Sequence, residues 1–510
     1  MGLWNFYFLA KLYLYFKGFI RLGFFWNLLF LLFLIIPAPK QHKYYRLLMV
    51  VKYSLSLVFG LLLLWRDSWF PPLLESIASL NRQGWPSKGY MYRFLAGSFN
   101  PLELIVVVFI LIFCLIATKY IRLTPVVIVL LLIVPLSEFG QSMGDTEKYL
   151  DAFYKSESGK VINFEKSKND DPDFDIIILH ICSLSWDDLK GVGIGKDDTF
   201  FKQFDYLLTD FNSVTTHSNP SAIRLLRANC GQQPHGALYN EAPAECYLFE
   251  SLRMQGYERY FTLNHDGTYG NFAEEVRLMG RLGEPLKPAG IPIQAYNFDG
   301  SAIFDDYHVL ERWWMTRQES NVKRAMVYYN TISLHEGAHW SEDKDWWKND
   351  RRLDNYKGFV QKLFRDTTKF IDLIASSGRN AVVIFIPEHG MALQSNILQP
   401  AGLREIPLPQ ITRVPVGIKL IGKGYNSSQP RPIFISKSTS YLSISYLLAS
   451  LIKENPFNPG AVLSGETIEN TPATEFVSEN EAARILKRGE GYFLYDKRKQ
   501  WIKLSESSLQ

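Results

Sequence analysis

Three apolar segments of the chain are each followed by side chains that can bind a metal ion or exchange protons. The groups are a thiol, a carboxylate and two imidazoles, a set that suits zinc. Singly, each has a simpler interpretation, since a lone cysteine is most often a small core residue and a Glu-His pair fits a solvated turn. Their occurrence after three similar segments favours one shared site. The pairs are Asp175–Ile181 with Cys182, Ala325–Thr331 with His335, and Asn380–Ile386 with Glu388 and His389.

Ser218 is the candidate nucleophile. It lies just before Ala222–Ala228, an apolar segment whose spacing predicts a helix. The N-terminus of a helix favours phosphate, because its backbone N–H groups and its dipole both attract negative charge. A simpler role is that Ser218 or Asn219 only caps the helix, and the two roles are compatible.

The segment His335–His339 matches the H-E-x-x-H pattern of zinc metalloproteases. In those enzymes both histidines lie on one face of a helix. Here the preceding Ala325–Thr331 is strand-like, and Gly337 disfavours a helix. We therefore expect no helix through both histidines, and a zinc protease that uses Glu336 as its base remains a rival function.

The elements that must position these residues alternate between short apolar strands and helices. Such strands are typical of a parallel sheet buried on both faces, and ligands bind such sheets at the carboxyl ends of the strands. We expect residues 173–510 to form one catalytic α/β/α sandwich with a mainly parallel central sheet. A C-terminal hairpin, Tyr492–Tyr495 with Trp501–Leu504, shows no residue with evident chemistry. The predicted covering helices are Ala222–Ala228, Tyr247–Gln255, Tyr307–Thr316 and Asp354–Ser377.

Charge and hydropathy separate residues 1–140 from the remaining chain. The first part contains thirteen Lys or Arg and four acidic residues, whereas the second contains 42 basic and 47 acidic residues. The net charge of the whole chain is only +4, which argues against a nucleic-acid partner. Long apolar runs predict a transmembrane domain of four to five helices over residues 1–140. The runs are Phe19–Pro37, Leu47–Trp65, Leu102–Thr118 and Pro125–Phe139, with Leu3–Lys17 as a weaker fifth candidate.

Basic loops predict the orientation of this domain. Clusters at Lys40–Arg46 and Lys119–Arg122 place two loops in the cytoplasm. The chain after the last apolar run then lies outside the cytoplasm. It begins with a polar linker, residues 141–172, in which we expect a short helix at Glu147–Tyr154.

The four cysteines differ in their surroundings. Cys230 and Cys246 lie 16 residues apart in the part expected outside the cytoplasm, where disulfides form, so we expect them to be bonded to each other. Cys114 lies inside an apolar run. Cys182 is left as the unpaired thiol, which supports a role in metal binding.

Short motifs spread over nearly the whole chain form a specific pattern. They are Trp4–Leu9, Ile181–Trp186, Phe211–Ser213, Ser218-x-Pro220-x-Ala222–Ala228, Cys230–Gln232, Phe298–Ser301, Pro387–Gly390 and Val414–Gly417. The pattern resembles the cellulose phosphoethanolamine transferase family, the G subunits of bacterial cellulose synthase operons. The resemblance implies an alkaline phosphatase-like domain in the periplasm, attached to the inner membrane of a Gram-negative bacterium. It also implies transfer of phosphoethanolamine from phosphatidylethanolamine to glucose hydroxyls of cellulose, beside other synthase subunits.

By matching positions, the resemblance assigns roles to single residues. Ser218 would be the nucleophile. One zinc ion would be bound by Cys182, Glu388 and His389, with Ser218 completing its coordination. Three further matches are His335 with an active-site histidine, Arg404 with a phosphate-contacting arginine, and Cys230–Cys246 with the family disulfide.

The chain departs from the family pattern beside the nucleophile. The family has Tyr-Ser-Gly-Pro, whereas this chain has His217, Ser218, Asn219 and Pro220. The immediate neighbours of Ser218 can therefore differ in role. Rival functions on the same scaffold are phosphoglycerol transfer, lipid A phosphoethanolamine transfer and sulfatase chemistry, and a further rival is a non-catalytic subunit of the synthase.

Overall fold

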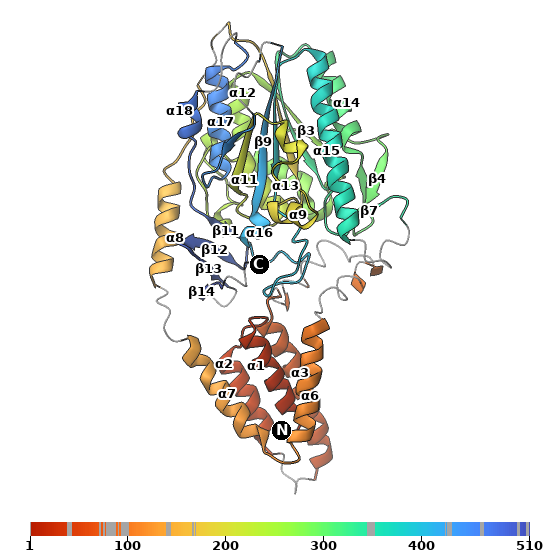
Figure 1. The fold of residues 1–510 in the computed structure, drawn as a ribbon, viewed down its shortest axis with the longest axis vertical. Coiled ribbons are helices and arrows are strands. Elements are labelled where there is room, and N and C mark those ends of the chain that lie inside the picture. Colours follow the sequence, from red (N-terminus) through yellow and green to blue (C-terminus); the bar gives the residue numbers. More distant parts are fainter. Residues whose placement is uncertain are drawn as a thin grey trace.

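A computed structural model places a bundle of apolar helices below a large α/β domain (Figure 1). The structure describes all residues except 1, 38–42, 71–72, 75–76, 78–87, 90, 93–100, 139–143, 166–167, 169, 344–351, 424, 426–430, 459–463, 497–499, 506–508 and 510. The helices of the bundle are α1 (Trp4–Phe16), α2 (Phe24–Ile35), α3 (Tyr45–Asp67), α6 (Pro101–Ala117) and α7 (Leu123–Glu138).

Helix α3 is a candidate membrane span. Among the described residues it is the one helix long and apolar enough to cross a membrane, and only 17% of its most apolar stretch is buried inside the protein. Its outward apolar side chains therefore suit contact with lipid. Helices α2, α6 and α7 are apolar but shorter, so the expectation of four to five spans remains a prediction.

Buried polar contacts hold the bundle together and join it to the C-terminal part of the chain. The Lys11 ammonium lies 2.6 Å from Asp67 and 2.8 Å from Asn27, which ties α1 to α3 and α2. At the upper end of the bundle, the Arg21 guanidinium lies 2.6 Å from the Asp496 carboxylate. Both ion pairs are largely removed from water, so either would be costly to break by removing one partner.

The large domain is built on a seven-stranded sheet in the order β10-β2-β9-β8-β1-β6-β3. All neighbouring pairs are parallel except the two that include β9, which runs opposite to β2 and β8. The mainly parallel sheet that we expected is therefore confirmed. The strands are β1 (Asp175–Ile181), β2 (Tyr206–Asn212), β3 (Tyr257–Leu263), β6 (Arg324–Thr331), β8 (Ala381–Pro387), β9 (Arg413–Ile421) and β10 (Ile433–Ile435).

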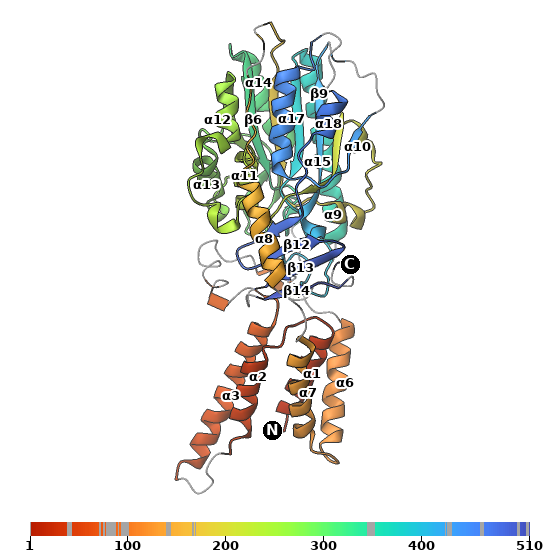
Figure 2. The ribbon, with the colours of Figure 1, turned by 90° about the vertical axis from the view of Figure 1, so that its left-hand side faces the viewer.

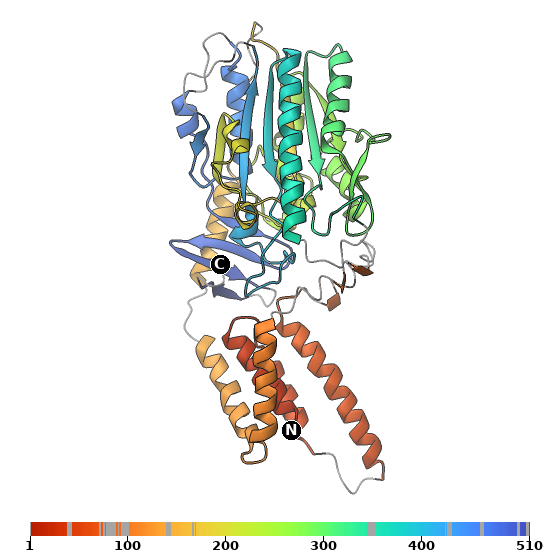
Figure 3. The ribbon, with the colours of Figure 1, turned by 45° about the vertical axis from the view of Figure 1, so that its right-hand side comes forward.

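Helices cover both faces of this sheet and give the α/β/α sandwich. Alternate residues of a strand point to opposite faces. Thus Ile176 and Ile178 of β1 join the core under α11, α12, α13 and α17, whereas Ile177 and Leu179 join the core under α9, α10, α14 and α15. Figure 3 shows α15, in teal, lying along the second face. The covering helices are α9 (Trp186–Gly191), α10 (Thr199–Lys202), α11 (Ser218–Leu226), α12 (Leu248–Met254), α13 (Phe272–Gly280), α14 (Asp306–Glu319), α15 (Arg352–Ser377) and α17 (Tyr441–Glu454).

A small antiparallel sheet from the C-terminus lies between the helical bundle and the large sheet (Figure 2). The hairpin that we expected is present, but it is half of a four-stranded sheet. Its apolar side chains pack against those of Leu398, Ile406 and Leu408, and Trp69 packs at the edge of the same cluster. The strands are β11 (Val477–Glu479), β12 (Arg484–Arg488), β13 (Gly491–Tyr495) and β14 (Trp501–Lys503), with α8 (Gly144–Glu157) alongside.

The remaining elements are short. They are β4 (Ile293–Tyr296), β5 (Ala302–Phe304), β7 (His339–Trp340), α16 (Pro409–Thr412) and α18 (Gly465–Glu469), with single 3-10 turns at His235–Ala237, Ala244–Cys246 and Tyr269–Asn271.

Candidate metal centre and active site

The carboxyl ends of two adjacent strands bring three ligand-type side chains together. Cys182 follows β1, and Glu388 and His389 follow β8, which pairs with β1 in parallel register. One ligand atom from each residue lies within 4.8 Å of the others, and all three side chains are buried. The backbone bond from Glu388 N–H to the Ile181 carbonyl, 2.8 Å long, continues the sheet ladder up to the site. These residues form a group that could hold a metal ion.

Close packing fixes the backbone after His389. A Cβ atom at Gly390 would lie 2.6 Å from both Ser185 Oγ and Asp188 Oδ2, so only glycine fits there. The Asp188 carboxylate accepts the N–H groups of Met391 and Leu393, at 2.7 and 3.0 Å. The turn after β8 therefore has one conformation, and it directs His389 into the site.

Ser218 stands at the edge of this group. Its Oγ lies 3.5 Å from Cys182 Sγ and 3.5 Å from His389 Nε2. The helix α11 begins at Ser218, earlier than the predicted start at Ala222, and its N-cap is His217, whose side chain makes no capping hydrogen bond. The capping role that we considered for Ser218 and Asn219 is therefore wrong, and the Ser218 hydroxyl faces the metal-type ligands.

Glu388 is held on one oxygen only. Its Oε1 accepts a 2.5 Å hydrogen bond from Asn330, whose own side-chain oxygen lies 3.0 Å from His265 Nε2. Its buried Oε2 makes no hydrogen bond to the described residues, and His389 Nε2 lies 3.6 Å from it. Burial raises the pKa of Glu388 to about 7, against the lowering effect of Ser218, Asn330, Cys182 and Arg404. A buried carboxylate oxygen without a hydrogen bond is costly, and a metal ion would satisfy it.

The other two side chains also fit a metal. Burial and the nearby Glu388 carboxylate raise the pKa of the Cys182 thiol to about 12. Burial and the Arg404 charge lower the pKa of His389 well below its usual range, so the ring is neutral. With its proton on Nδ1, His389 donates to the Gly390 carbonyl at 2.9 Å, and the Nε2 lone pair then faces Cys182 and Ser218. Imidazole ligands are commonly oriented in this way by a backbone carbonyl.

Arg404 approaches from the loop between β8 and α16. Its Nη1 donates to Ser183 Oγ at 3.2 Å and lies 3.0 Å from His389 Nδ1. Because Nδ1–H already donates to Gly390, two donors face each other at this point. An anion placed between Arg404 and Ser218 would accept from this guanidinium, which suits a phosphate group.

His335 lies on the other side of the site, in the turn after β6. Its ring stacks on Phe298, with centroids 5.4 Å apart, and Tyr269 lies at 6.4 Å. Burial and the positive charge of Arg404 lower its pKa to about 3. His335 is not part of the metal-type group found among the described residues, but the charge of Arg404 acts on its ring.

The H-E-x-x-H segment is not helical. His335–Ala338 forms turns, Gly337 has a φ of +79°, and His339 lies in β7. Glu336 makes a 2.9 Å ion pair with Arg352 instead of facing a histidine pair. The expectation that no helix runs through both histidines is therefore confirmed, and the geometry of a helical zinc protease is absent from this described segment.

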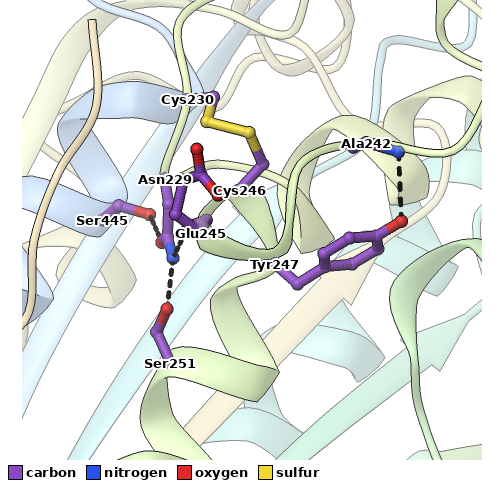
Figure 4. Close-up of a disulfide and its surroundings, with 8 residues drawn as sticks. All are labelled: Asn229, Cys230, Ala242, Glu245, Cys246, Tyr247, Ser251 and Ser445. Atoms are coloured by element: carbon purple, nitrogen blue, oxygen red, sulfur yellow. Dashed lines mark hydrogen bonds between the residues drawn. A yellow bond between two sulfur atoms is a disulfide. The ribbon is translucent and has the colours of Figure 1, made fainter.

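Cys230 and Cys246 form the expected disulfide (Figure 4). Cys230 follows the helix that carries Ser218, and Cys246 precedes α12. Next to the disulfide, Asn229 Nδ2 donates to Ser251 Oγ at 2.8 Å, and Asn229 Oδ1 accepts from Ser445 at the same distance. These contacts join α11 to α12 and α17 and so fix the far end of the nucleophile helix.

Sequence reasoning missed the residues that support the site. Asn330 occupies the next-to-last position of β6, so the rule that strand ends carry chemistry could have found it. His265 carries no such signal, since its role depends on a contact with Asn330 that forms only in the folded chain.

Two models of one protein family together match nearly the whole chain. The family model described as cellulose biosynthesis protein BcsG, C-terminal domain, matches residues 137–501, and its N-terminal domain matches residues 4–136. The chain is 31% identical to cellulose biosynthesis protein BcsG of Escherichia coli (strain K12), over 95% of this chain and 92% of that protein. The identity and coverage are the same for the protein of that name from Salmonella typhimurium.

Solved structures show only a distant likeness. A protein in the alkaline phosphatase superfamily from Vibrio parahaemolyticus has a TM-score of 0.47 at 14% identity, covering 71% of this chain and 91% of that one. The lipoteichoic acid synthase LtaP from Listeria monocytogenes has the same TM-score at 13% identity, covering 70% and 95%. On the sequence matches alone, which span both parts of the molecule, the chain belongs to the cellulose biosynthesis protein BcsG family.

Proposed function

We propose that the protein is a membrane-anchored, zinc-dependent phosphoethanolamine transferase. It would move phosphoethanolamine from phosphatidylethanolamine to glucose hydroxyls of cellulose through a covalent intermediate on Ser218. The observation that carries the proposal is the position of the Ser218 hydroxyl, 3.5 Å from both Cys182 Sγ and His389 Nε2 in a member of a cellulose biosynthesis family. An alkaline phosphatase-like origin of the domain is part of this proposal.

Cys182, Glu388 and His389 would hold a single zinc ion, with Ser218 next to it. A thiolate with an imidazole and a carboxylate favours zinc over the harder magnesium or calcium ions. When bound, zinc lowers the pKa of a neighbouring hydroxyl and balances negative charge on a phosphoryl oxygen. The Glu388 Oε2, which makes no hydrogen bond to the described residues, supports this assignment.

In the first half-reaction, Ser218 Oγ forms a bond to the phosphorus of the lipid donor. The bond from phosphorus to the diacylglycerol oxygen breaks, and that oxygen takes up the proton that the serine loses. In the second half-reaction, a glucose hydroxyl attacks the same phosphorus, the Ser218–phosphorus bond breaks, and the proton of the sugar hydroxyl returns to Ser218. Atoms and charge balance over the two halves.

His335 and Arg404 would assist both halves. Arg404 would donate to the equatorial phosphoryl oxygens, where negative charge increases in the transition state. His335 would carry the proton between Ser218, the leaving oxygen and the sugar hydroxyl. The negative phosphate offsets the Arg404 charge that now lowers the pKa of His335, and so brings that pKa closer to the range in which proton transfer is efficient.

The location of the two substrates follows from the anchor. A lipid donor lies in the membrane, so tethering the domain by α3 raises the effective donor concentration at the site. The Cys230–Cys246 disulfide supports an oxidising compartment for the domain. We place the bundle in the inner membrane as a multi-pass domain and the catalytic part in the periplasm, next to the subunits that synthesise cellulose.

The test is intact mass spectrometry of the full chain in detergent, after incubation with zinc and phosphatidylethanolamine. We expect a phosphoethanolamine-sized adduct on Ser218 in the wild type and in Ser464→Ala, a serine change at the start of α18. Ser218→Ala should give none. An adduct in Ser218→Ala would contradict the scheme.

The same experiment separates the rival donors. With phosphatidylglycerol as donor, a phosphoglycerol adduct in place of the phosphoethanolamine adduct would favour phosphoglycerol transfer, and a chromogenic sulfate ester would reveal a sulfatase. A scaffold subunit would form none of these adducts. If the donor half-reaction occurs, transfer to cello-oligosaccharide rather than to lipid A identifies the acceptor.

A further inference from the structure

The C-terminal sheet reaches the active site through Asn480, which directly follows β11. This residue is only 3% exposed. Its side-chain oxygen accepts from the Thr215 hydroxyl at 2.9 Å and from the Thr216 N–H at 3.2 Å. Its side-chain nitrogen donates to the backbone carbonyls of Arg404 and Glu405, each at 3.0 Å, and to Thr216 Oγ1 at 2.6 Å. One amide therefore bonds two separate segments of the site.

The chemistry of the contacts defines the orientation of this amide. Its oxygen meets a hydroxyl and a backbone N–H, whereas its nitrogen meets two carbonyl oxygens. The reverse orientation would place the nitrogen against a backbone donor and the oxygen against two acceptors. Aspartate has the same shape but no N–H donor, so it would lose the hydrogen bonds to the carbonyls of the Arg404 segment.

One of the two segments leads to the proposed nucleophile, and the other carries the proposed phosphate-binding arginine. Thr215 and Thr216 lead directly into Ser218, and the other segment carries Arg404. The described chain from the end of β8 at Pro387 to the start of α16 at Pro409 contains no helix or strand. The position of Arg404 therefore depends on tertiary hydrogen bonds, of which the Asn480 contacts and the bond from the Thr216 hydroxyl to the Arg404 carbonyl are the nearest.

We propose that Asn480 is a positioning residue, which holds the Arg404 guanidinium at the distance from Ser218 that a bound phosphoryl group requires. Asn480 acts through the two backbone segments and does not touch the substrate itself. The inference rests on the proposed function, but only in so far as Ser218 attacks a phosphorus that Arg404 binds. It does not depend on which lipid supplies that phosphorus.

The test compares Asn480→Asp with Ser478→Ala in the full chain, in detergent with zinc. Ser478 is a buried neighbour whose hydroxyl bonds to Asn212 at 2.9 Å and lies 3.2 Å from the Thr412 hydroxyl, so its removal is a matched change in the same strand. We expect Asn480→Asp to slow formation of the Ser218 adduct about 100-fold, since misplacement by about 1 Å can cost that much. Ser478→Ala should stay within about twofold of the wild type.

Two readouts distinguish positioning from general stability. Orthovanadate, a mimic of the phosphoryl group, should raise the Tm of the wild type and of Ser478→Ala, and should raise that of Asn480→Asp much less at the same concentration. The zinc content and the Tm without vanadate should match between the two variants. Wild-type adduct rates and vanadate response in Asn480→Asp would overturn the proposal, and so would a loss that follows zinc loss or a lower Tm.

A milder variant serves as the test if Asn480→Asp does not fold. Thr215→Val keeps the side-chain shape and removes one donor to the Asn480 oxygen, and we expect a loss of several-fold in adduct rate with a reduced vanadate response. An unchanged response in this variant would contradict the proposal. If the wild type forms no adduct with phosphatidylethanolamine, the transferase function fails, while the vanadate comparison still decides the role of Asn480.

Discussion

The candidate site has two halves that the backbone holds in different ways. In the strand-end half, Cys182, Glu388 and His389 directly follow paired strands, and Ser218 is the first residue of a helix. In the loop half, Arg404 and His335 lie in irregular connections. Sheet hydrogen bonds define the positions of the first half closely, whereas the second half depends on scattered side-chain contacts. Under the proposed function, metal binding belongs to the strand-end half and phosphate binding to the loop half.

If the halves are separable, the largest effect comes from the strand-end half. Cys182→Ala removes a ligand, so we expect zinc content to fall from one ion per chain to none and the Ser218 adduct to decrease at least about 1,000-fold. Elemental analysis measures the zinc content, and intact mass spectrometry measures the Ser218 adduct. Cys114 is the other buried free cysteine. Cys114→Ala should keep the zinc content and the Ser218 adduct of the wild type.

A change in the loop half should leave the metal in place. Arg404→Gln removes a charged donor to the phosphoryl oxygens, and we expect kcat to decrease about 100- to 1,000-fold with full zinc content. Arg253→Gln, which changes an arginine on the surface, should behave like the wild type. Loss of zinc in Arg404→Gln would show that the two halves are one unit.

Removing the Cys230–Cys246 disulfide tests whether the strand-end half depends on contacts at the end of α11 that lies away from Ser218. The double change Cys230→Ser with Cys246→Ser releases a short loop, so the free energy of unfolding should decrease by about 3 kcal/mol. Denaturant unfolding measures this loss. Adduct formation per folded molecule should remain, because the end of α11 that carries Ser218 is held by the sheet. A loss of adduct at full folding would mean that the disulfide also positions the nucleophile.

The smallest effect concerns Glu479 of β11, next to the loop half. Burial raises its pKa from an ordinary 4.5 to about 7, against the lowering effect of the His235 N–H and Arg484. The folded state therefore binds this proton more tightly than the unfolded state. Its contribution to stability is complete below pH 4.5 and is lost as the pH rises to about 7.

Glu479→Gln should remove this part of the pH dependence, which we expect to be on the order of 2 kcal/mol. Denaturant unfolding of both proteins at pH 5 and pH 7 measures it. The same difference between the two pH values in the wild type and in Glu479→Gln would show that Glu479 is not responsible.

Sequence reasoning succeeded where one element carries the signal. The apolar segments around β1, β6 and β8 agree with the structure within one residue at each end, because continuous burial on both faces leaves a strong pattern. It failed for β2, β3, β9 and β10, whose residues alternate less clearly. The start of α11 was placed four residues late, because Ser218, Asn219 and Pro220 are typical of a turn and also fit the first turn of a helix.

The sequence by itself determined the ligand types, the separation into an apolar and a catalytic part, and the mainly parallel sheet, since each depends on residue type and local periodicity. Only the tertiary structure decided which side chains meet. The bond from Asn330 to Glu388, the approach of Arg404 to Ser183 and the double contact of Asn480 join segments up to 265 residues apart. Such contacts leave no local pattern, because they depend on the order of strands in the sheet and on the paths of the loops above it.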